Sequence, residues 1–330
     1  MWILFFFGIL FLSLYIYTYP RVGDWLLFIT QQYRMFKHGF SERCYRVNGM
    51  PIAALENNSL KFEGSRPLLI MVHGFSADKS VWLPLASKLK DQFHIVIPDL
   101  PGHGDTGYSP QWNYSVKAQA EILCSLIWQL GYQRAHVIGN SMGGHIAAWM
   151  ARYHESSIAS AVLLSPGGLP GVQKSKLDKL MEQGLNPFFV QERGDFRKLL
   201  ALSMSRPPYM PSIVKDAMAQ RYIAKRAQYE HIFRDYSASG YLNSSSMAKT
   251  RPPLFIIWGM KDALIHVSAM RNWSDTVPCA TQVFHDLGHM PMLEAPKRIY
   301  YCLDHFYQKH KDFIKPKPID KPLNIYRNIP

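Results

Sequence analysis

The stretch Gly-Asn-Ser-Met-Gly at positions 139–143 constrains the fold of this chain more than any other. An apolar, β-branched run precedes it at 135–138, and a run typical of a helix follows it at 144–153. Between a strand and a helix, Gly-x-Ser-x-Gly is typical of a nucleophile elbow, in which glycines allow strand and helix to pass closely. The first amides of the helix favour negative charge beside the serine. A simple turn is the alternative, but the flanking elements favour Ser141 as a catalytic nucleophile.

Composition predicts one large domain and argues against nucleic acid as a partner. The chain has 330 residues, of which 48% are hydrophobic, which is enough for a single extensive core. Its net charge of +13 is compatible with nucleic acid, an anionic membrane surface or an acidic ligand. The basic residues are scattered, without zinc-knuckle spacing, a glycine-rich RNA signature or a basic helix. A membrane surface is therefore the favoured interpretation of the charge.

The cysteines indicate neither a disulfide framework nor a metal site. They lie far apart and show no paired spacing: Cys44, Cys124, Cys279 and Cys302. We therefore expect no metal.

The amino-terminal segment predicts a membrane anchor. Residues 2–19 form an uncharged run of about 18 residues, just long enough to span a bilayer, and Pro20 and Arg21 end it. A cleaved signal peptide is the alternative, but the run has no basic leading region and no small-x-small site follows it. We expect residues 1–20 to be a single retained anchor and the protein to be located at a membrane.

Charge bias around this run predicts the side on which the body of the protein lies. Only the amino terminus precedes the run, whereas five basic residues follow it: Arg21, Arg34, Lys37, Arg43 and Arg46. The positive-inside tendency then places the catalytic domain in the cytoplasm rather than in a periplasmic or secreted location. Residues 21–39 are rich in aromatic and apolar side chains and predict an interfacial helix along the headgroups, with an ordinary packed helix as the alternative.

From about Phe40 onward, strand patterns alternate with helix patterns. Short strands at 43–47 and 52–55 flank the turn Asn48-Gly49, as in an antiparallel hairpin. Six apolar runs suit strands buried on both faces of a parallel sheet: 67–72, 94–97, 135–138, 159–164, 254–258 and 282–284. Helical patterns separate them: 81–89, 116–130, 144–153, 267–273 and 297–307. This alternation predicts an α/β fold with a mostly parallel central sheet flanked by helices.

One long segment, 168–249, interrupts the alternation. It has helical patterns, including 174–183 and 214–234, and no convincing strand. A structureless loop of this length is improbable in a compact domain, so we predict a helical cap or lid over the ligand crevice. Its apolar residues line a pocket or form the cap's own small core: Leu185, Phe188, Phe189, Val190, Met204, Tyr209 and Met210. The hydrolytic core would then comprise 40–167 and 250–312, followed by a basic, proline-rich tail at 313–330.

A serine nucleophile needs a base and an orienting acid, which in this topology follow in the order Ser, Asp, His. Asp262 follows the strand 254–258 through a glycine turn, and His289 lies between the last strand and the last helix. We predict that His289 takes the Ser141 proton and that Asp262 orients the imidazole. The competing acids are Asp99, Asp275, Asp286 and Asp304. The competing histidines are His73, His103, His145 and His285, for which structural roles are expected.

Two backbone amides complete the predicted site as an oxyanion hole. The turn His73-Gly74-Phe75 follows the strand 67–72, and it would direct the amide of Phe75 toward the serine. The amide of Met142 is the second donor, and one such donor is worth roughly 3 kcal/mol of barrier. The glycine-rich loop at 98–104 lacks phosphate-binding spacing and is interpreted as structural support.

Together these motifs resemble a lipase or esterase of the α/β-hydrolase fold superfamily. The resemblance covers about 65–310 and rests on His-Gly-Phe at 73–75, the loop 98–104, the elbow, Trp258-Gly259 with Asp262, and Gly288-His289. The octet Val-His-Gly-Phe-Ser-Ala-Asp-Lys at 72–79 and the anchor resemble more narrowly the membrane-anchored monoacylglycerol lipases and their bacterial relatives. The resemblance implies cofactor-free hydrolysis of medium- or long-chain lipid esters.

Two other functions remain open on the sequence. Carbon–carbon bond hydrolases of aromatic meta-cleavage products have a similar elbow, although their oxyanion turn usually carries a Gly-Pro-Gly run where this chain has Phe75-Ser76-Ala77. A non-catalytic binding protein of the same fold usually lacks a triad residue, whereas all three are present here. Acyl-chain preference and oligomeric state do not follow from the sequence.

Overall fold

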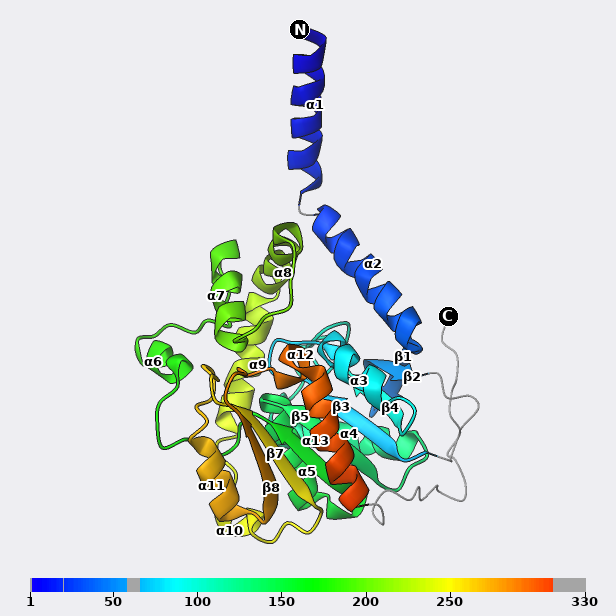
Figure 1. The fold of residues 1–330 in the computed structure, drawn as a ribbon, viewed down its shortest axis with the longest axis vertical. Helices are drawn as coiled ribbons and strands as arrows, with labels where there is room; N and C mark the ends of the chain where they lie inside the picture. Colours follow the sequence, from blue (N-terminus) through cyan, green and yellow to red (C-terminus); the bar gives the residue numbers. More distant parts are fainter. Residues whose placement is uncertain (1, 20, 58–65, 311–330) are drawn as a thin grey trace.

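A single eight-stranded sheet organises the described part of the chain. The computed structural model describes residues 2–19, 21–57 and 66–310 (Figure 1). The strands lie side by side in the order β1-β2-β4-β3-β5-β6-β7-β8. Their bounds are β1 (Phe40–Val47), β2 (Met50–Asn57), β3 (Leu68–Val72), β4 (His94–Pro98), β5 (Ala135–Asn140), β6 (Ile158–Leu164), β7 (Leu254–Gly259) and β8 (Cys279–Phe284).

The pairing confirms the prediction of a mostly parallel sheet. β1 is antiparallel to β2, and β2 is antiparallel to β4, whereas every other neighbouring pair is parallel. The hairpin between β1 and β2 turns at Asn48 and Gly49, whose φ angles of 49° and 83° are both positive, as a type I′ turn requires.

Helices cover both faces of the sheet because the strands are apolar on both sides. Along β3, Leu68, Ile70 and Val72 belong to one buried cluster, while Leu69 and Met71 belong to the other, as the two-residue period of a strand dictates. α4 (Val116–Gln129), α5 (Met142–Tyr153) and α11 (Ala269–Thr276) contribute to the first cluster. α3 (Leu83–Leu89), α12 (Pro291–Glu294) and α13 (Pro296–Lys309) contribute to the second (Figure 1).

The segment between β6 and β7 consists of helices joined by loops. They are α6 (Lys176–Glu182), α7 (Arg193–Ser203), α8 (Ser212–Ala224), α9 (Arg226–Ala238) and α10 (Ser244–Met247). The expectation of one continuous helical pattern at 214–234 is wrong, because Lys225 (φ −95°, ψ 7°) separates α8 from α9. The Lys225 ammonium donates to the carbonyl oxygen of Gly104 at 2.8 Å, which connects the junction of the two helices to the loop that follows β4.

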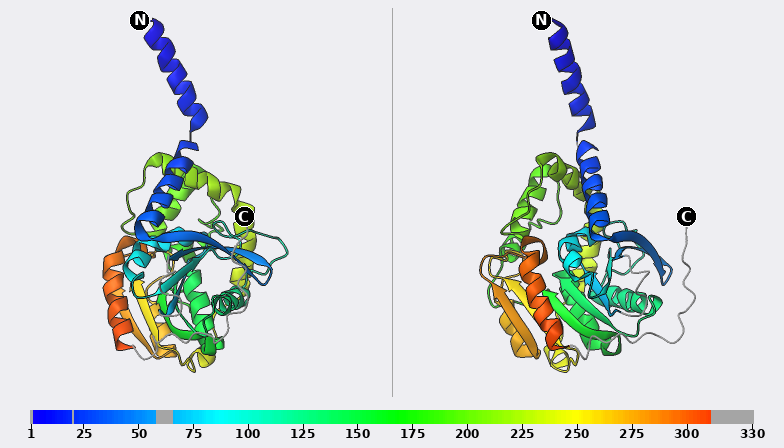
Figure 2. Two further views of the ribbon diagram at one scale, coloured as in Figure 1. Left: turned by 90° about the vertical axis from the view of Figure 1, so that its right-hand side faces the viewer. Right: turned by 45° about the vertical axis from the view of Figure 1, so that its right-hand side comes forward.

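Two helices precede the sheet. α1 (Trp2–Thr18) stands clear of the body, and α2 (Arg21–His38) runs beside α8 toward β1 (Figure 2). Among the described residues, no helix combines the length and the apolar character needed to cross a membrane. The helix expected from the amino-terminal run is therefore present, but the structure does not support its prediction as a transmembrane anchor.

Some sequence-based expectations fall outside the described residues. These are the basic, proline-rich tail at 313–330, the last two residues of the expected second core segment, and both end positions, 1 and 20, of the expected anchor.

Candidate active site

Ser141 occupies a strained position at the junction of β5 and α5. Its φ of 57° is positive, which is uncommon for a residue with a side chain and persists only when the surroundings enforce it. The enforcement comes from close backbone contacts: a Cβ on Gly139 would lie 2.1 Å from the carbonyl oxygen of Gly143. A Cβ on Gly143 would lie 2.3 Å from the carbonyl oxygen of Val72. Only glycine fits at either position, so the Gly-x-Ser-x-Gly pattern is a steric requirement here.

Asp262 and His289 are in direct contact beyond the carboxyl ends of β7 and β8. Asp262 Oδ2 lies 2.7 Å from His289 Nδ1, and both residues are buried. The other carboxylate oxygen accepts the backbone N–H groups of Leu264 and Ile265, each at 2.9 Å. An aspartate held in this way fixes Nδ1 as the protonated nitrogen and leaves Nε2 as the basic one.

Asn140 connects the nucleophile to the loop that carries His289. Its buried side-chain amide donates to the carbonyl oxygen of His289 at 2.9 Å and to that of Leu164 at 3.0 Å. Within the described chain there is no hydrogen bond between the Ser141 hydroxyl and the His289 imidazole. Such contacts often tighten only when substrate binds. The side chain of Asn140 therefore joins the elbow directly to the backbone of the loop that carries His289.

Glu294 also holds the loop that carries His289. Its carboxylate accepts the N–H of Gly288 at 3.0 Å and the N–H groups of Ser205 and Arg206, each at 2.9 Å. The His289 N–H itself donates to the carbonyl oxygen of Ser203 at 3.1 Å. The base is thus tied to the helical insertion. Sequence reasoning missed both Asn140 and Glu294, although Asn140 lies within the motif that it singled out.

The turn after β3 lies beside the nucleophile. A Cβ on Gly74 would be only 3.1 Å from the Cβ of Ser141. The Ala77 N–H donates to the carbonyl oxygen of Gly74 at 3.3 Å, which closes a four-residue turn at 74–77, here called the oxyanion turn. Phe75 is in this turn and Met142 is the first residue of α5, so both predicted amide donors belong to segments adjoining Ser141.

Asp99, the buried competitor for the acid, has a structural partner. Its carboxylate lies 2.6 Å from the Lys79 ammonium, which also contacts the exposed carboxylate of Asp105. Burial alone would lower the pKa of Lys79, but these two carboxylates raise it above its usual range. Of the other competing acids, Asp275 and Asp286 pair with arginines and Asp304 accepts from a glutamine.

None of the competing histidines named above has a hydrogen bond to an orienting carboxylate among the described residues. His73 Nε2 accepts the N–H of Leu100, and His103 Nδ1 lies 3.1 Å from the carbonyl oxygen of Pro101. Burial lowers the pKa of His145 to about 4, so its imidazole is neutral at pH 7. His285 is exposed and contacts Met260. Only His289, of the histidines considered, contacts a carboxylate next to the elbow.

An aromatic cluster lies between the oxyanion turn and the helical insertion. The Phe75 ring centroid is 5.2 Å from that of Phe188, 5.3 Å from that of Phe233 and 5.7 Å from that of Tyr229. Phe188, Val190 and Met204 are buried, as expected for a pocket or a small core. Leu185 and Tyr209 are 56% and 92% exposed, so the expectation of apolar lining is wrong for these two.

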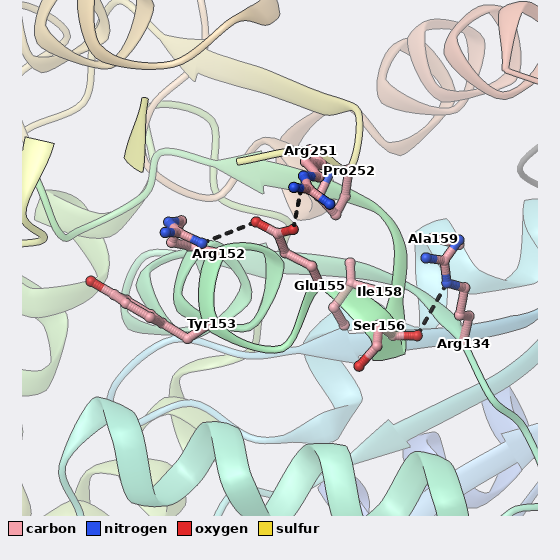
Figure 3. A pocket seen from close by; sticks show the side chains of 9 residues that line it. All are labelled: Arg134, Arg152, Tyr153, Glu155, Ser156, Ile158, Ala159, Arg251 and Pro252. Carbon is pink, nitrogen blue, oxygen red and sulfur yellow. Dashed lines mark hydrogen bonds and ion pairs between the residues drawn. The ribbon is translucent and has the colours of Figure 1, made fainter. Parts of the chain in front are cut away.

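A surface cavity of about 560 Å³ lies at the opposite edge of the sheet (Figure 3). It is lined by residues that precede β5, β6 and β7, including Arg134, Arg152 and Arg251. Glu155 pairs with the last two at 3.0 Å and 3.7 Å, and Arg134 donates to the carbonyl oxygen of Ser156. No residue of the Asp262–His289 pair or the elbow lines it.

Comparisons with known proteins find relatives of this chain. A family model described as the alpha/beta hydrolase fold matches residues 67–296. Lipase 3 of a Moraxella species is 32% identical over 256 residues, which are 76% of this chain and 79% of that protein. A monoacylglycerol lipase of Xenopus laevis is 27% identical over 286 residues, covering 83% of this chain and 81% of its own length. The crystal structure of a membrane phospholipase A, a bacterial virulence factor, matches with a TM-score of 0.84 and 30% identity, over 94% of this chain and 100% of that chain.

Replacing Asn140 with alanine should destabilise the junction of the two loops. The change removes two hydrogen bonds and leaves the buried carbonyl oxygen of His289 without a donor, while the carbonyl oxygen of Leu164 keeps the N–H of Ser141. We therefore expect the free energy of unfolding to fall by about 2 kcal/mol. Urea denaturation followed by tryptophan fluorescence measures this loss. Asn272→Ala is the matched control, because its amide donates to the carbonyl oxygen of Pro170 at an exposed site, where about 0.5 kcal/mol is expected. Equal losses in the two variants would contradict the role of Asn140.

Proposed function

The chain belongs to the α/β-hydrolase fold family and is a serine ester hydrolase, and we propose that it cleaves acyl esters of lipids, monoacylglycerols or similar medium- to long-chain esters, through a triad of Ser141, Asp262 and His289. The observation that carries this proposal is the buried Asp262–His289 contact of 2.7 Å, next to a serine held at a positive φ by its glycine neighbours. The Asp262–His289 contact supports the proposal because an activated serine requires a base and an acid that orients that base.

The proposed reaction is acyl transfer in two halves. Ser141 Oγ forms a bond to the ester carbonyl carbon while its proton passes to His289 Nε2, and the Asp262 carboxylate stabilises the imidazolium. The amides of Phe75 and Met142 hold the oxyanion, each contributing roughly 3 kcal/mol. The carbon–oxygen bond then breaks, His289 protonates the departing alcohol, and water repeats the sequence to release the fatty acid.

Lipid esters are favoured as substrates by the surroundings of the serine. The aromatic cluster of Phe75, Phe188, Tyr229 and Phe233 offers an apolar wall for an acyl chain next to the oxyanion turn. The relatives are named as a lipase, a monoacylglycerol lipase and a membrane phospholipase A, which supports a lipid ester as the substrate.

A substrate panel tests the proposal, with Ser141→Ala as the decisive variant. We expect turnover of p-nitrophenyl esters of rising chain length and of a monoacylglycerol, and a fall of about 10⁴-fold or more in Ser141→Ala because the acyl-enzyme no longer forms. Ser156→Ala, in the distant arginine-lined cavity, should leave turnover unchanged.

The same panel distinguishes the other two functions. It includes a dienol substrate of carbon–carbon bond hydrolases, and serine-dependent turnover of that compound alone would move the protein to that class. No turnover of any substrate would instead favour a non-catalytic binding protein.

We further propose that the amino-terminal helices hold the enzyme at a membrane surface, with the catalytic domain on the cytoplasmic side. α1 exposes a set of large apolar side chains, with Trp2, Phe5 and Phe11 between 63% and 80% exposed. On α2, Trp25 and Phe36 are 61% and 86% exposed. Exposed apolar surface of this kind is typical of interfacial segments, and the net charge of +13 favours anionic headgroups.

Deleting residues 1–18 tests the membrane proposal. The truncation keeps Tyr19, whose hydroxyl donates to Asp216 on α8, so α2 should retain its position. We expect the truncated protein to hydrolyse a soluble short ester as the full chain does, but to stay in the supernatant when anionic vesicles are sedimented. A truncated protein that still sediments with the vesicles would contradict the role of α1. The full chain with Trp2, Phe5 and Phe11 changed to serine should behave like the truncation.

A further inference from the structure

The helical insertion contacts both loops on which the proposed chemistry depends. α7 ends at Ser203, whose carbonyl oxygen accepts the N–H of His289 at 3.1 Å. α8 carries Tyr222, whose hydroxyl donates to the carbonyl oxygen of Ser76 at 2.6 Å. Ser76 follows Phe75 in the oxyanion turn. The second contact is made by one hydroxyl group, so a single substitution can remove it without altering the backbone.

The oxyanion turn needs support from outside itself. Its closing hydrogen bond, from Ala77 N–H to the Gly74 oxygen, is long at 3.3 Å. Ser76 has a φ of 58°, and Phe75 is not among the residues with positive φ, so the turn is of type II. Glycine or asparagine usually occupies the third position of this turn, because other side chains disfavour a positive φ. The Tyr222 hydroxyl contacts the strained residue itself.

Tyr222 is well placed to supply that support. Its ring centroid lies 4.9 Å from that of Phe196 on α7 and 5.5 Å from that of Tyr229 on α9. Burial raises the pKa of Tyr222 to about 12, so the phenol keeps its proton at neutral pH and remains a donor. The ring contacts restrict the orientation of the side chain, which lowers the entropic cost of the hydrogen bond.

The helix that carries Tyr222 is itself held against the amino-terminal helix. The neighbouring residue, Arg221, pairs with Asp24 of α2 at 2.8 Å. A Cβ on Gly23 would lie 2.2 Å from the carbonyl oxygen of Ile213. The backbones of α2 and α8 are therefore in direct contact at this position, and the two helices lie side by side (Figure 1). These contacts anchor α8 through the helix face that contains Ile213 and Arg221, which adjoins the face that contains Tyr222.

We infer that Tyr222 is a positioning residue for ester hydrolysis: its hydroxyl holds Ser76 so that the adjacent Phe75 amide stays directed at the oxyanion. This inference rests on the proposed function of Ser141 and the two amides. Tyr222 contacts the turn and acts through Phe75. Because the oxyanion exists only near the transition state, a loosened donor lowers kcat and leaves KM almost unchanged.

Tyr222→Phe tests the inference, because it removes the hydroxyl and keeps the ring. With a soluble p-nitrophenyl ester and the full chain, we expect kcat to fall about tenfold, less than the 10²-fold or greater loss typical of removing an oxyanion donor outright. KM should change by less than about twofold. A purely structural loosening of the insertion would instead raise KM, because substrate contacts would weaken along with those of the transition state.

Tyr108→Phe is the matched control. The Tyr108 hydroxyl also joins the core to the insertion, at 2.9 Å from His231 Nδ1 on α9, but it does not contact the oxyanion turn. We expect its kcat and KM to match those of the unmodified protein. An unchanged kcat in Tyr222→Phe, or equal losses in the two variants, would overturn the inference.

Hydrogen exchange separates a failure of this inference from a failure of the proposed function. Amides of segment 74–80 should exchange about fivefold faster in Tyr222→Phe than in Tyr108→Phe, because one neutral hydrogen bond restrains that turn. This measurement requires no turnover. If the unmodified protein hydrolysed no ester, the proposed function would fail, and faster exchange would still support the contribution of Tyr222 to the turn. Unchanged exchange would overturn it.

Discussion

The close approach of three backbone segments at the elbow is the constraint on which the site depends. α5 begins against the end of β3, because Gly143 has no side chain to meet the Val72 carbonyl oxygen, and it passes β5 at Gly139. The Ser141 N–H donates to Leu164 of β6 at 3.0 Å, which ties the strained residue to the neighbouring strand. The parallel sheet brings these segments to one edge, and the contacts hold Ser141 at its positive φ. Any side chain at either glycine would separate helix from sheet and displace the serine.

The loops around the serine are held by polar groups whose partners are almost all backbone atoms. Asn140 and Glu294 fix the His289 loop, and Asp99 accepts backbone N–H groups of Lys79 and Asp105 besides pairing with the Lys79 ammonium. Buried polar groups of this kind are costly when unpaired, so each partner is strongly specified. The insertion adds contacts at Ser203 and Tyr222. The site is therefore shaped by two layers, the sheet edge below and the helices above.

The sequence predicted the sheet, the elbow and the contact of Asp262 with His289, because these follow from local patterns and from the order of strands in a parallel fold. It gave no bounds for α7 within the expected helical segment. It also did not predict the break at Lys225, where a tertiary contact with Gly104 overrides helical periodicity. The hydroxyl of Tyr222 reaches a carbonyl oxygen 146 positions away, and no local pattern encodes such a pairing.

Covalent trapping tests the central claim most directly. A lipid-tailed fluorophosphonate should react with an activated serine and give a tetrahedral adduct that resembles the reaction intermediate. After trypsin digestion, mass spectrometry should find the added mass on the peptide 135–152, at Ser141, and His289→Ala should slow its formation strongly. A label on another residue, or no label in a preparation that hydrolyses esters, would contradict the assignment of Ser141 as the nucleophile.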